Sequence, residues 1–306
     1  MTWVKRIGLF FLVNMAIMIM VSLILNLLGV GQYRTVQGLD QGNLLVFCLV
    51  WGMVGSFVSL LLSKQIAIWT MKVQLIDPRA MGAEGELVRL VDRLSKSAGL
   101  GKTPVVGIYP GQEVNAFATG PTKNRALVAV SQGLLQRMDK DEVEGVLAHE
   151  VSHIANGDMV TMTLIQGVVN AFVMYIARVA AYGVSQFLRG DNEREGGGLS
   201  HLTYALTVMA FEVVFGILGS IVVASFSRYR EYRADAGGAR LAGRHKMIGA
   251  LRRLQTAMER GVQEPEQSGS SSLAAFKIAG RPSGFLALFS THPPLEARIA
   301  RLQQAG

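Results

Sequence analysis

The sequence has little cysteine and little charge. Cys48 is the only cysteine among 306 residues, so no disulfide can form within the chain. It lies in an apolar run, where we expect it to act as a small hydrophobic side chain. Only 17% of the residues are charged, whereas 50% are hydrophobic. This balance excludes an ordinary soluble domain and indicates segments that lie in a lipid bilayer.

The charge that is present is mostly positive. Thirty Lys and Arg residues against 22 Asp and Glu residues give a net charge of +8. Nucleic-acid binding would favour a basic stripe interleaved with aromatic side chains, and the sequence has none. The basic residues cluster beside apolar runs, as they do in the cytoplasmic loops of membrane proteins. We therefore expect a lipid bilayer as a partner, and no nucleic acid.

Four apolar runs are free of proline and almost free of charge. They are Ile7–Val30, Asn43–Ser63, Met159–Leu188 and Leu202–Phe226. A span of about 20 residues crosses a bilayer, so each run is a candidate transmembrane helix. The first is longer than the apolar core of a signal peptide, about 7–15 residues, and is interpreted as an uncleaved anchor. Basic residues follow the second and fourth runs, which predicts that both polar parts of the chain are cytoplasmic.

Two charges, Arg178 and Glu212, interrupt the third and fourth runs. If these runs form a hairpin, the two charges lie at similar depth. A lone charge in a bilayer is costly and tends to find a partner, so we expect these side chains to pair. The alternative is a hairpin that does not cross the bilayer completely and keeps both charges in water.

The stretch Ala148–His153 contains the pattern H-E-x-x-H, a known zinc-protease signature when it lies on a helix. Side chains four residues apart share a helical face, so His149 and His153 can bind one metal ion. Glu150 projects from the adjoining flank, where it could act as the base for a water molecule. The alternative is a surface helix with two unrelated histidines, but the chain has only 5 histidines in all.

A third ligand is expected from a second helix, because catalytic zinc takes three protein ligands and keeps one position for water. Within Arg230–Asp235, the carboxylates of Glu231 and Asp235 stand four residues apart on one predicted helical face. We assign Glu231 as the third ligand and Asp235 as the carboxylate that orients a ligand histidine. The alternative is a solvated helix with Glu–Arg pairs, which would be preferred if His149 and His153 were absent.

The polar parts of the chain show regular patterns. Apolar residues at helical spacing predict an amphipathic helix over 87–98, and β-rich runs at 105–109 and 126–130 predict a small sheet. Asp139 and Glu142 predict the capped start of the motif helix, and Gly157 its end. Gly243 is expected to end the helix of the third ligand. Loops are expected at 189–200 and 261–272, and a last helix over 295–303.

Four motifs together resemble the HtpX-type bacterial membrane metalloproteases, which are distant relatives of the CAAX prenyl proteases. The motifs are H-E-V-S-H-I-A-N-G-D from His149, R-E-Y-R-A-D from Arg230, N-A-F-A-T-G from Asn115 and T-H-P-P from Thr291. The resemblance covers essentially the whole chain. It implies one Zn²⁺ per chain in a zinc metalloendopeptidase, a hydrolase.

The resemblance also implies further site residues. It places Asn115, Ala116, Phe117 and Ala118 in an edge strand that binds an extended substrate as an added strand. It places His292 and Arg298 beside the zinc, where a cationic donor could stabilise an oxyanion. The alternatives are an ordinary core strand and the ordinary start of a helix.

The expected fold is α+β: a mostly helical membrane protein with transmembrane helices and a zincin-type protease domain that carries a small β-sheet. The expected parts are two transmembrane helices in 1–72, the first part of the protease domain in 73–158, a hydrophobic hairpin in 159–226 and the second part of the protease domain in 227–306. By resemblance, the protein lies in the bacterial inner membrane with a cytoplasmic catalytic domain. It would degrade misfolded or damaged membrane proteins under stress, functionally alongside the FtsH protease.

Three other functions compete with this interpretation. A prenyl-protein protease shares the motifs but requires a chamber built from more than four apolar segments. A non-catalytic chaperone with structural zinc would usually present four ligands, often cysteines. A transporter would have charged or broken helices throughout, whereas only Arg178 and Glu212 interrupt these runs.

Overall fold

The computed structural model describes residues 38–189, 201–263 and 288–304, together with residues 19–21, 23–25, 27, 29, 34 and 35. Contacts divide the chain into two compact units. The first consists of Met1–Ser59 and Met162–Val223, and the second of Leu60–Thr161 and Ala224–Gly306. The expected anchor at 7–30 lies largely outside the described residues.

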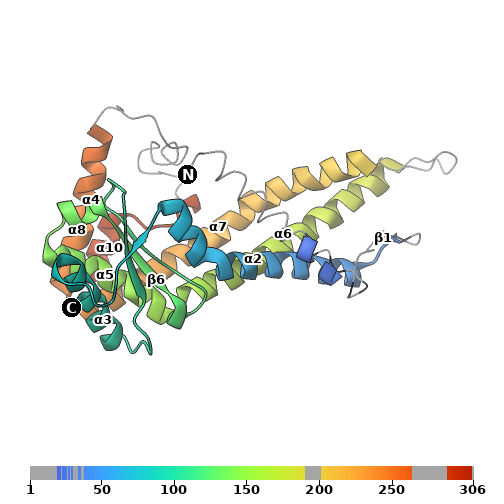
Figure 1. Ribbon diagram of the computed structural model, residues 1–306. Helices are drawn as coiled ribbons and strands as arrows, with labels where there is room; N and C mark the ends of the chain where they lie inside the picture. Colours follow the sequence, from blue (N-terminus) through green and yellow to red (C-terminus); the bar gives the residue numbers. More distant parts are fainter. Residues whose placement is uncertain are drawn as a thin grey trace. The chain divides into compact units, whose positions relative to one another are not determined.

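Three long helices carry the other apolar runs: α2 (Gln41–Met71), α6 (Asp158–Arg189) and α7 (His201–Ala242). All three are long and apolar enough to cross a membrane (Figure 1). Helix α7 is a single helix that includes both the fourth apolar run and the Arg230–Asp235 segment. The change from apolar to charged residues after Phe226 therefore does not break the helix.

Arg178 and Glu212 form the expected pair within the first unit. The Arg178 Nη1 atom lies 2.6 Å from Oε1 of Glu212 and donates a second hydrogen bond to the Met174 carbonyl. The Arg178 guanidinium also lies 5.5 Å from the centre of the Phe47 ring, which is on α2. One arginine thus connects side chains of α2, α6 and α7.

Reversing one of these charges should destabilise the bundle of α2, α6 and α7. Arg178→Glu would place two carboxylates together, and an unpaired charge within a membrane costs about 2.5–3.5 kcal/mol. The double variant Arg178→Glu/Glu212→Arg should recover most of this loss, as measured by thermal unfolding in detergent. If the double variant unfolds no later than Arg178→Glu alone, the pair does not stabilise the bundle.

The second unit contains a mixed four-stranded sheet. Its strands are β3 (Gln74–Leu75), β4 (Val105–Tyr109), β5 (Ala116–Thr119) and β6 (Leu127–Ser131), in the order β3-β4-β6-β5. β4 and β6 are parallel, and the other two pairs are antiparallel. Two short strands, β1 (Arg34–Thr35) and β2 (Gly38–Leu39), pair separately in the first unit.

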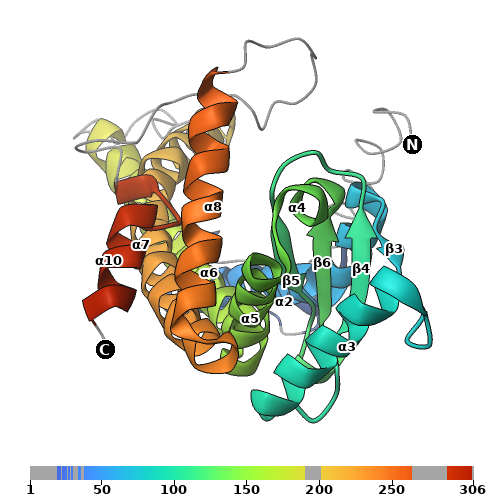
Figure 2. The same cartoon turned by 90° about the vertical axis from the view of Figure 1, so that its left-hand side faces the viewer.

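Helices α3 (Gly82–Ser97) and α5 (Lys140–Asn156) share a core with one face of this sheet (Figure 2). Because side chains alternate along a strand, Val128 and Val130 of β6 join this core. Leu127 and Ala129 face the other side and pack against Tyr109 and Phe117. The amphipathic helix and the sheet expected from the sequence are both present.

The remaining elements are η1 (Lys123–Arg125), α4 (Gln132–Arg137), α8 (Arg244–Gln263) and α10 (Leu295–Gln304). Gly243 has a φ of 98° and separates α7 from α8, as expected. Helix α8 extends to Gln263, so the first three residues of the loop expected at 261–272 are helical. The rest of that loop lies outside the described residues, as does most of the loop expected at 189–200.

Candidate metal centre

Helix α5 presents two histidines at one place. It begins with a capping box, in which Asp139 accepts a hydrogen bond from the Glu142 amide and Glu142 accepts one from the Asp139 amide. It ends at Gly157, whose left-handed conformation (φ 72°) closes the last turn. His149 and His153 are buried one turn apart near this end. The motif helix therefore has the start and the end that the sequence predicts.

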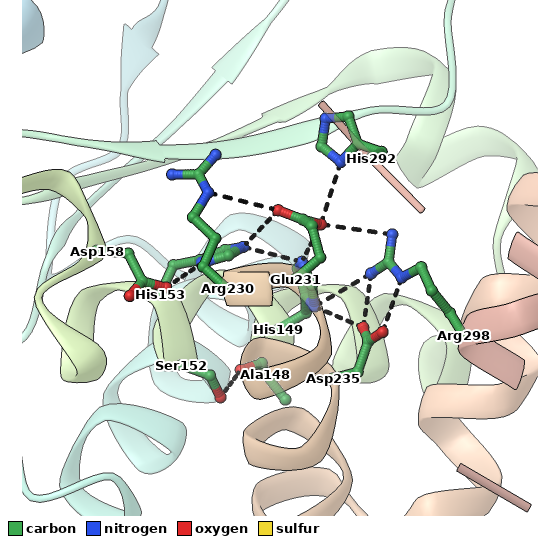
Figure 3. A network of polar contacts seen from close by, with 10 residues as sticks. All are labelled: Ala148, His149, Ser152, His153, Asp158, Arg230, Glu231, Asp235, His292 and Arg298. Atoms are coloured by element: carbon green, nitrogen blue, oxygen red, sulfur yellow. Dashed lines mark hydrogen bonds and ion pairs between the residues drawn. The ribbon is translucent and has the colours of Figure 1, made fainter. Parts of the chain in front are cut away.

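His149, His153 and Glu231 converge on one point (Figure 3). The two Nε2 atoms lie 3.1 Å apart. Oε2 of Glu231 lies 3.5 Å from Nε2 of His149, and Oε1 of Glu231 lies 3.4 Å from Nε2 of His153. Donors bound to a tetrahedral zinc at about 2.0–2.1 Å would be roughly 3.4 Å apart, so this spacing fits the ion.

The hydrogen bonds of the two imidazoles also favour a cation. Nδ1 of His149 lies 3.0 Å from Oδ1 of Asp235, and Nδ1 of His153 lies 2.6 Å from Oδ2 of Asp158. When each neutral imidazole donates its proton from Nδ1, both Nε2 lone pairs face each other and the Glu231 carboxylate. Such facing acceptors repel one another unless a positive charge lies between them. The donor set is therefore the one that Zn²⁺ prefers.

The same carboxylates control the protonation of the histidines. Burial by itself lowers the pKa of His153, but the hydrogen bonds to Asp158 and Glu231 outweigh it and raise this pKa to about 9. Burial likewise opposes protonation of His149, whereas Asp235 and Glu231 raise its pKa above the usual value. The site thus attracts positive charge at the imidazoles, and a metal ion at Nε2 would meet the same negative partners.

Asp235 is held between two helices. Its carboxylate accepts two hydrogen bonds from Arg298, at 2.7 Å to Nε and 2.6 Å to Nη2, and it also contacts His149. Nη1 of Arg298 lies 3.5 Å from Glu231, and the Arg298 side chain is buried. Arg298 therefore links α10 to two carboxylates of α7, those of Asp235 and Glu231. The resemblance implied a position beside the metal, but it did not imply this link.

His292 and Glu150 also lie near the three candidate ligands. Nδ1 of His292 is 3.1 Å from Oε2 of Glu231, although 62% of the His292 side chain is exposed. Glu150 is partly buried, and its negative charge acts on both His153 and Arg298. Both residues thus lie within electrostatic reach of the ligands without belonging to the cluster of three donors.

Among the described residues, strand β5 pairs with β6 alone and is therefore an edge strand of the four-stranded sheet. It includes Ala116, Phe117 and Ala118, and the exposed Asn115 comes just before it. Helix α5 packs against β5. One edge of the sheet therefore lies beside the helix that carries His149 and His153.

Two glycines of α7 let the ligand helices approach each other. A Cβ atom on Gly238 would lie 3.1 Å from the His149 amide nitrogen and 2.8 Å from Sδ of Met247. A Cβ atom on Gly237 would lie 2.8 Å from Cβ of Ser152. The contact between α5 and α7, which brings Glu231 to the histidines, thus requires residues without side chains at this level.

Gly238→Ala should weaken metal binding. The added methyl group pushes α7 from α5 and moves Glu231 away from the two histidines, which should cost about 1–3 kcal/mol of stability and about tenfold in zinc affinity. Chelator competition and thermal unfolding measure the two effects. Gly216→Ala is the matched control, because a Cβ atom there meets nothing within 4 Å. Equal zinc affinity in the two variants would contradict this role of Gly238.

Sequence reasoning did not identify Asp158 as the partner of His153. The signal is present, because Gly157 ends α5 in a left-handed turn that brings the next residue back toward the last helical turn. Asp158 is buried and its carboxylate accepts from His153. A carboxylate directly after a C-terminal glycine, five residues after a ligand histidine, could have been recognised as such a partner.

Comparisons with known proteins agree with this geometry. The profile of peptidase family M48 matches residues 82–305. The chain is 53% identical over 301 residues to Protease HtpX of Cellvibrio japonicus, covering 98% of this chain and 99% of that protein. It is 52% identical over 307 residues to a Protease HtpX homolog of Bacillus licheniformis, covering 98% and 99%.

Among solved structures, Ste24p of S. mikatae has the same fold, with a TM-score of 0.59 at 17% sequence identity. The similarity covers 98% of this chain but only 64% of the Ste24p chain. The match over residues 82–305 and the curated relatives at 52–53% identity confirm the family expected from the four motifs. The chain belongs to peptidase family M48 and is a membrane metallopeptidase of the HtpX type.

Proposed function

We propose that this chain is a zinc endopeptidase that hydrolyses misfolded or damaged membrane proteins at the cytoplasmic face of the bacterial inner membrane. The observation that carries the proposal is the arrangement of His149, His153 and Glu231. Both Nε2 atoms face a buried carboxylate, and both Nδ1 atoms are bound by further carboxylates. Three protein ligands leave a fourth position open, as catalytic rather than structural zinc sites do.

In this proposal the zinc ligands are His149, His153 and Glu231. When bound, Zn²⁺ polarises the scissile carbonyl and makes water more acidic. Glu150 takes the proton of the attacking water and transfers it to the leaving amine. Asp158 and Asp235 keep each ligand imidazole in the tautomer that directs Nε2 to the ligand cluster.

His292 is proposed to donate to the oxyanion, because its exposed ring lies beside Glu231. Arg298 is proposed to hold Asp235, since both oxygens of that carboxylate accept from the guanidinium. Its charge also lies near the ligands. In this proposal His292 contacts the substrate, whereas Arg298 fixes the geometry of the ligands.

The substrate is proposed to bind as an extended strand along β5. Within the described structure, the edge of Asn115–Ala118 that faces away from β6 is unpaired. It can add a strand through backbone hydrogen bonds, which do not depend on the substrate's side chains. A substrate held in this way must be locally unfolded. This requirement fits misfolded or damaged proteins better than intact ones.

Membrane attachment is proposed to come from two N-terminal helices within 1–72 and a hairpin within 159–226, with protease parts at 73–158 and 227–306. Within the described part of the chain, three helices are long and apolar enough to span a bilayer. The basic residues after α2 and after the apolar part of α7 support a cytoplasmic protease domain. A stress-response role alongside the FtsH protease is carried over from the resemblance.

A prenyl-protein protease is the second candidate, because the fold of Ste24p is similar. That likeness concerns the fold alone, and this chain spans only 64% of the Ste24p length. A casein substrate distinguishes the two candidates, since it carries no prenylated C-terminus. A non-catalytic chaperone would not cleave casein.

Removal of the metal tests the proposed function. The purified protein in detergent should cleave denatured casein, lose this activity after treatment with a chelator and regain it when Zn²⁺ is added back. The melting temperature should fall when the metal is removed and recover when Zn²⁺ is added back, because an ion that binds only the folded state stabilises that state. Cleavage at an unchanged rate by protein shown to be free of metal would contradict the proposal.

A further inference from the structure

Arg228 lies on α7 three residues before Glu231, so the two side chains are neighbours on the helix surface. Nη1 of Arg228 donates hydrogen bonds to the carbonyls of Leu288, at 2.9 Å, and Ser290, at 2.7 Å. Its Nη2 donates to Oγ of Ser225 at 3.0 Å, which orients the guanidinium. One side chain of the ligand helix therefore binds the backbone just before His292.

Ser290 connects Arg228 to His292 through two hydrogen bonds. The Ser290 hydroxyl donates to the His292 carbonyl at 2.6 Å, so Ser290 connects to Arg228 through its carbonyl and to His292 through its side chain. The His292 ring returns to the same helix, because its Nδ1 lies 3.1 Å from Glu231 (Figure 3). Helix α7 thus holds this segment at two points, through Arg228 and through Glu231.

Packing does not fix His292, since 62% of its side chain is exposed. The polar contacts therefore contribute to the placement of its ring, together with the buried Pro293 that follows it. Without the bonds from Arg228, the segment would lose two of its hydrogen bonds to α7 and keep the contact between His292 and Glu231. A loss of about 1 Å in the placement of a reacting group can reduce a rate by about 100-fold.

We infer that Arg228 is a positioning residue that seats the segment Leu288–His292 on the ligand helix and thereby places the His292 imidazole beside the metal centre. This inference rests on the proposed function of His292. The hydrogen bonds described for Arg228 go to Leu288, Ser290 and Ser225 and not to the three ligands, so its effect on cleavage passes through His292.

Hydrogen exchange tests the seating independently of activity. In zinc-loaded protein, Arg228→Ala should speed amide exchange in the peptide that covers 288–292 by about tenfold, because the segment loses two anchoring hydrogen bonds. Arg233→Ala is the matched control, since Arg233 is an exposed arginine on the same helix. Equal exchange in the two variants overturns the inference, even if the wild-type protein cleaves no substrate.

Cleavage kinetics test whether the effect passes through His292. Arg228→Ala should lower kcat by about tenfold at unchanged zinc content, and Arg228→Lys, which keeps one donor group, should recover part of the loss. In the His292→Ala background, Arg228→Ala should have no further effect. Losses that multiply in the double variant overturn the inference. They leave the protease proposal intact, because metal removal tests that proposal separately.

Discussion

Glu150→Gln is expected to lower kcat about 1,000-fold while the protein keeps its metal, since general acid–base catalysis contributes about 100-fold to 10,000-fold. Glutamine has nearly the shape of glutamate but cannot accept the proton of the attacking water. The cluster of possible ligands consists of His149, His153 and Glu231, so the substitution leaves all three donors in place. This variant should therefore bind zinc as the wild-type protein does but cleave substrate far more slowly.

The measurement combines zinc analysis with casein cleavage in detergent. Glu144→Gln is the matched control, because Glu144 lies on the same helix and binds Arg93 and Lys246 away from the ligands. Lys246 also contacts Asp141, so this control does not leave the lysine without an acidic partner. Zinc-loaded Glu150→Gln that cleaves within tenfold of the wild-type rate would show that another group acts as the base.

Arg298→Ala should have the largest effect on stability. It removes the bidentate contact between the Arg298 guanidinium and the Asp235 carboxylate. Among the described residues, His149 would then be the remaining partner of this buried carboxylate. Loss of one member of a buried ion pair typically costs about 3–5 kcal/mol, because the remaining charge stays out of water. Arg298→Lys should rescue only part of this loss, since an ammonium group cannot form the bidentate contact.

Thermal unfolding of zinc-loaded protein measures this effect. Arg301→Ala provides the control on the same helix, because Arg301 is exposed and lies over the Tyr232 ring at 4.6 Å. An exposed contact of this kind contributes about 0.5–1 kcal/mol. If the two variants unfold at the same temperature, the Arg298–Asp235 pair does not hold α10 to the ligand helix.

The parts of the site that follow helical periodicity could be predicted from the sequence. His149 and His153 stand on one face of α5, and Glu231 and Asp235 stand on one face of α7, as their spacing requires. The capping box at Asp139 and the end of α5 at Gly157 are also local features. Each depends on residues within one or two helical turns, which the sequence displays directly.

Contacts that depend on the tertiary arrangement could not be predicted in the same way. Arg298 and Asp235 are 63 residues apart, and nothing in either segment identifies the other as its partner. Arg228 similarly meets a carbonyl 62 residues away, and carbonyls carry no sequence signal. The contact of α7 with α5 depends on Gly237 and Gly238, whose role appears only when the two backbones are placed together.

The connection between α5 and α6 limits how this chain can change in length. Gly157 alone separates Asn156 from Asp158, and this single residue brings the Asp158 carboxylate to His153. A substitution by asparagine could still adopt the left-handed conformation. An inserted residue would instead turn the start of α6 by about 100° and carry Asp158 away from the imidazole. The site therefore tolerates a change of residue at this junction better than a change in the number of residues.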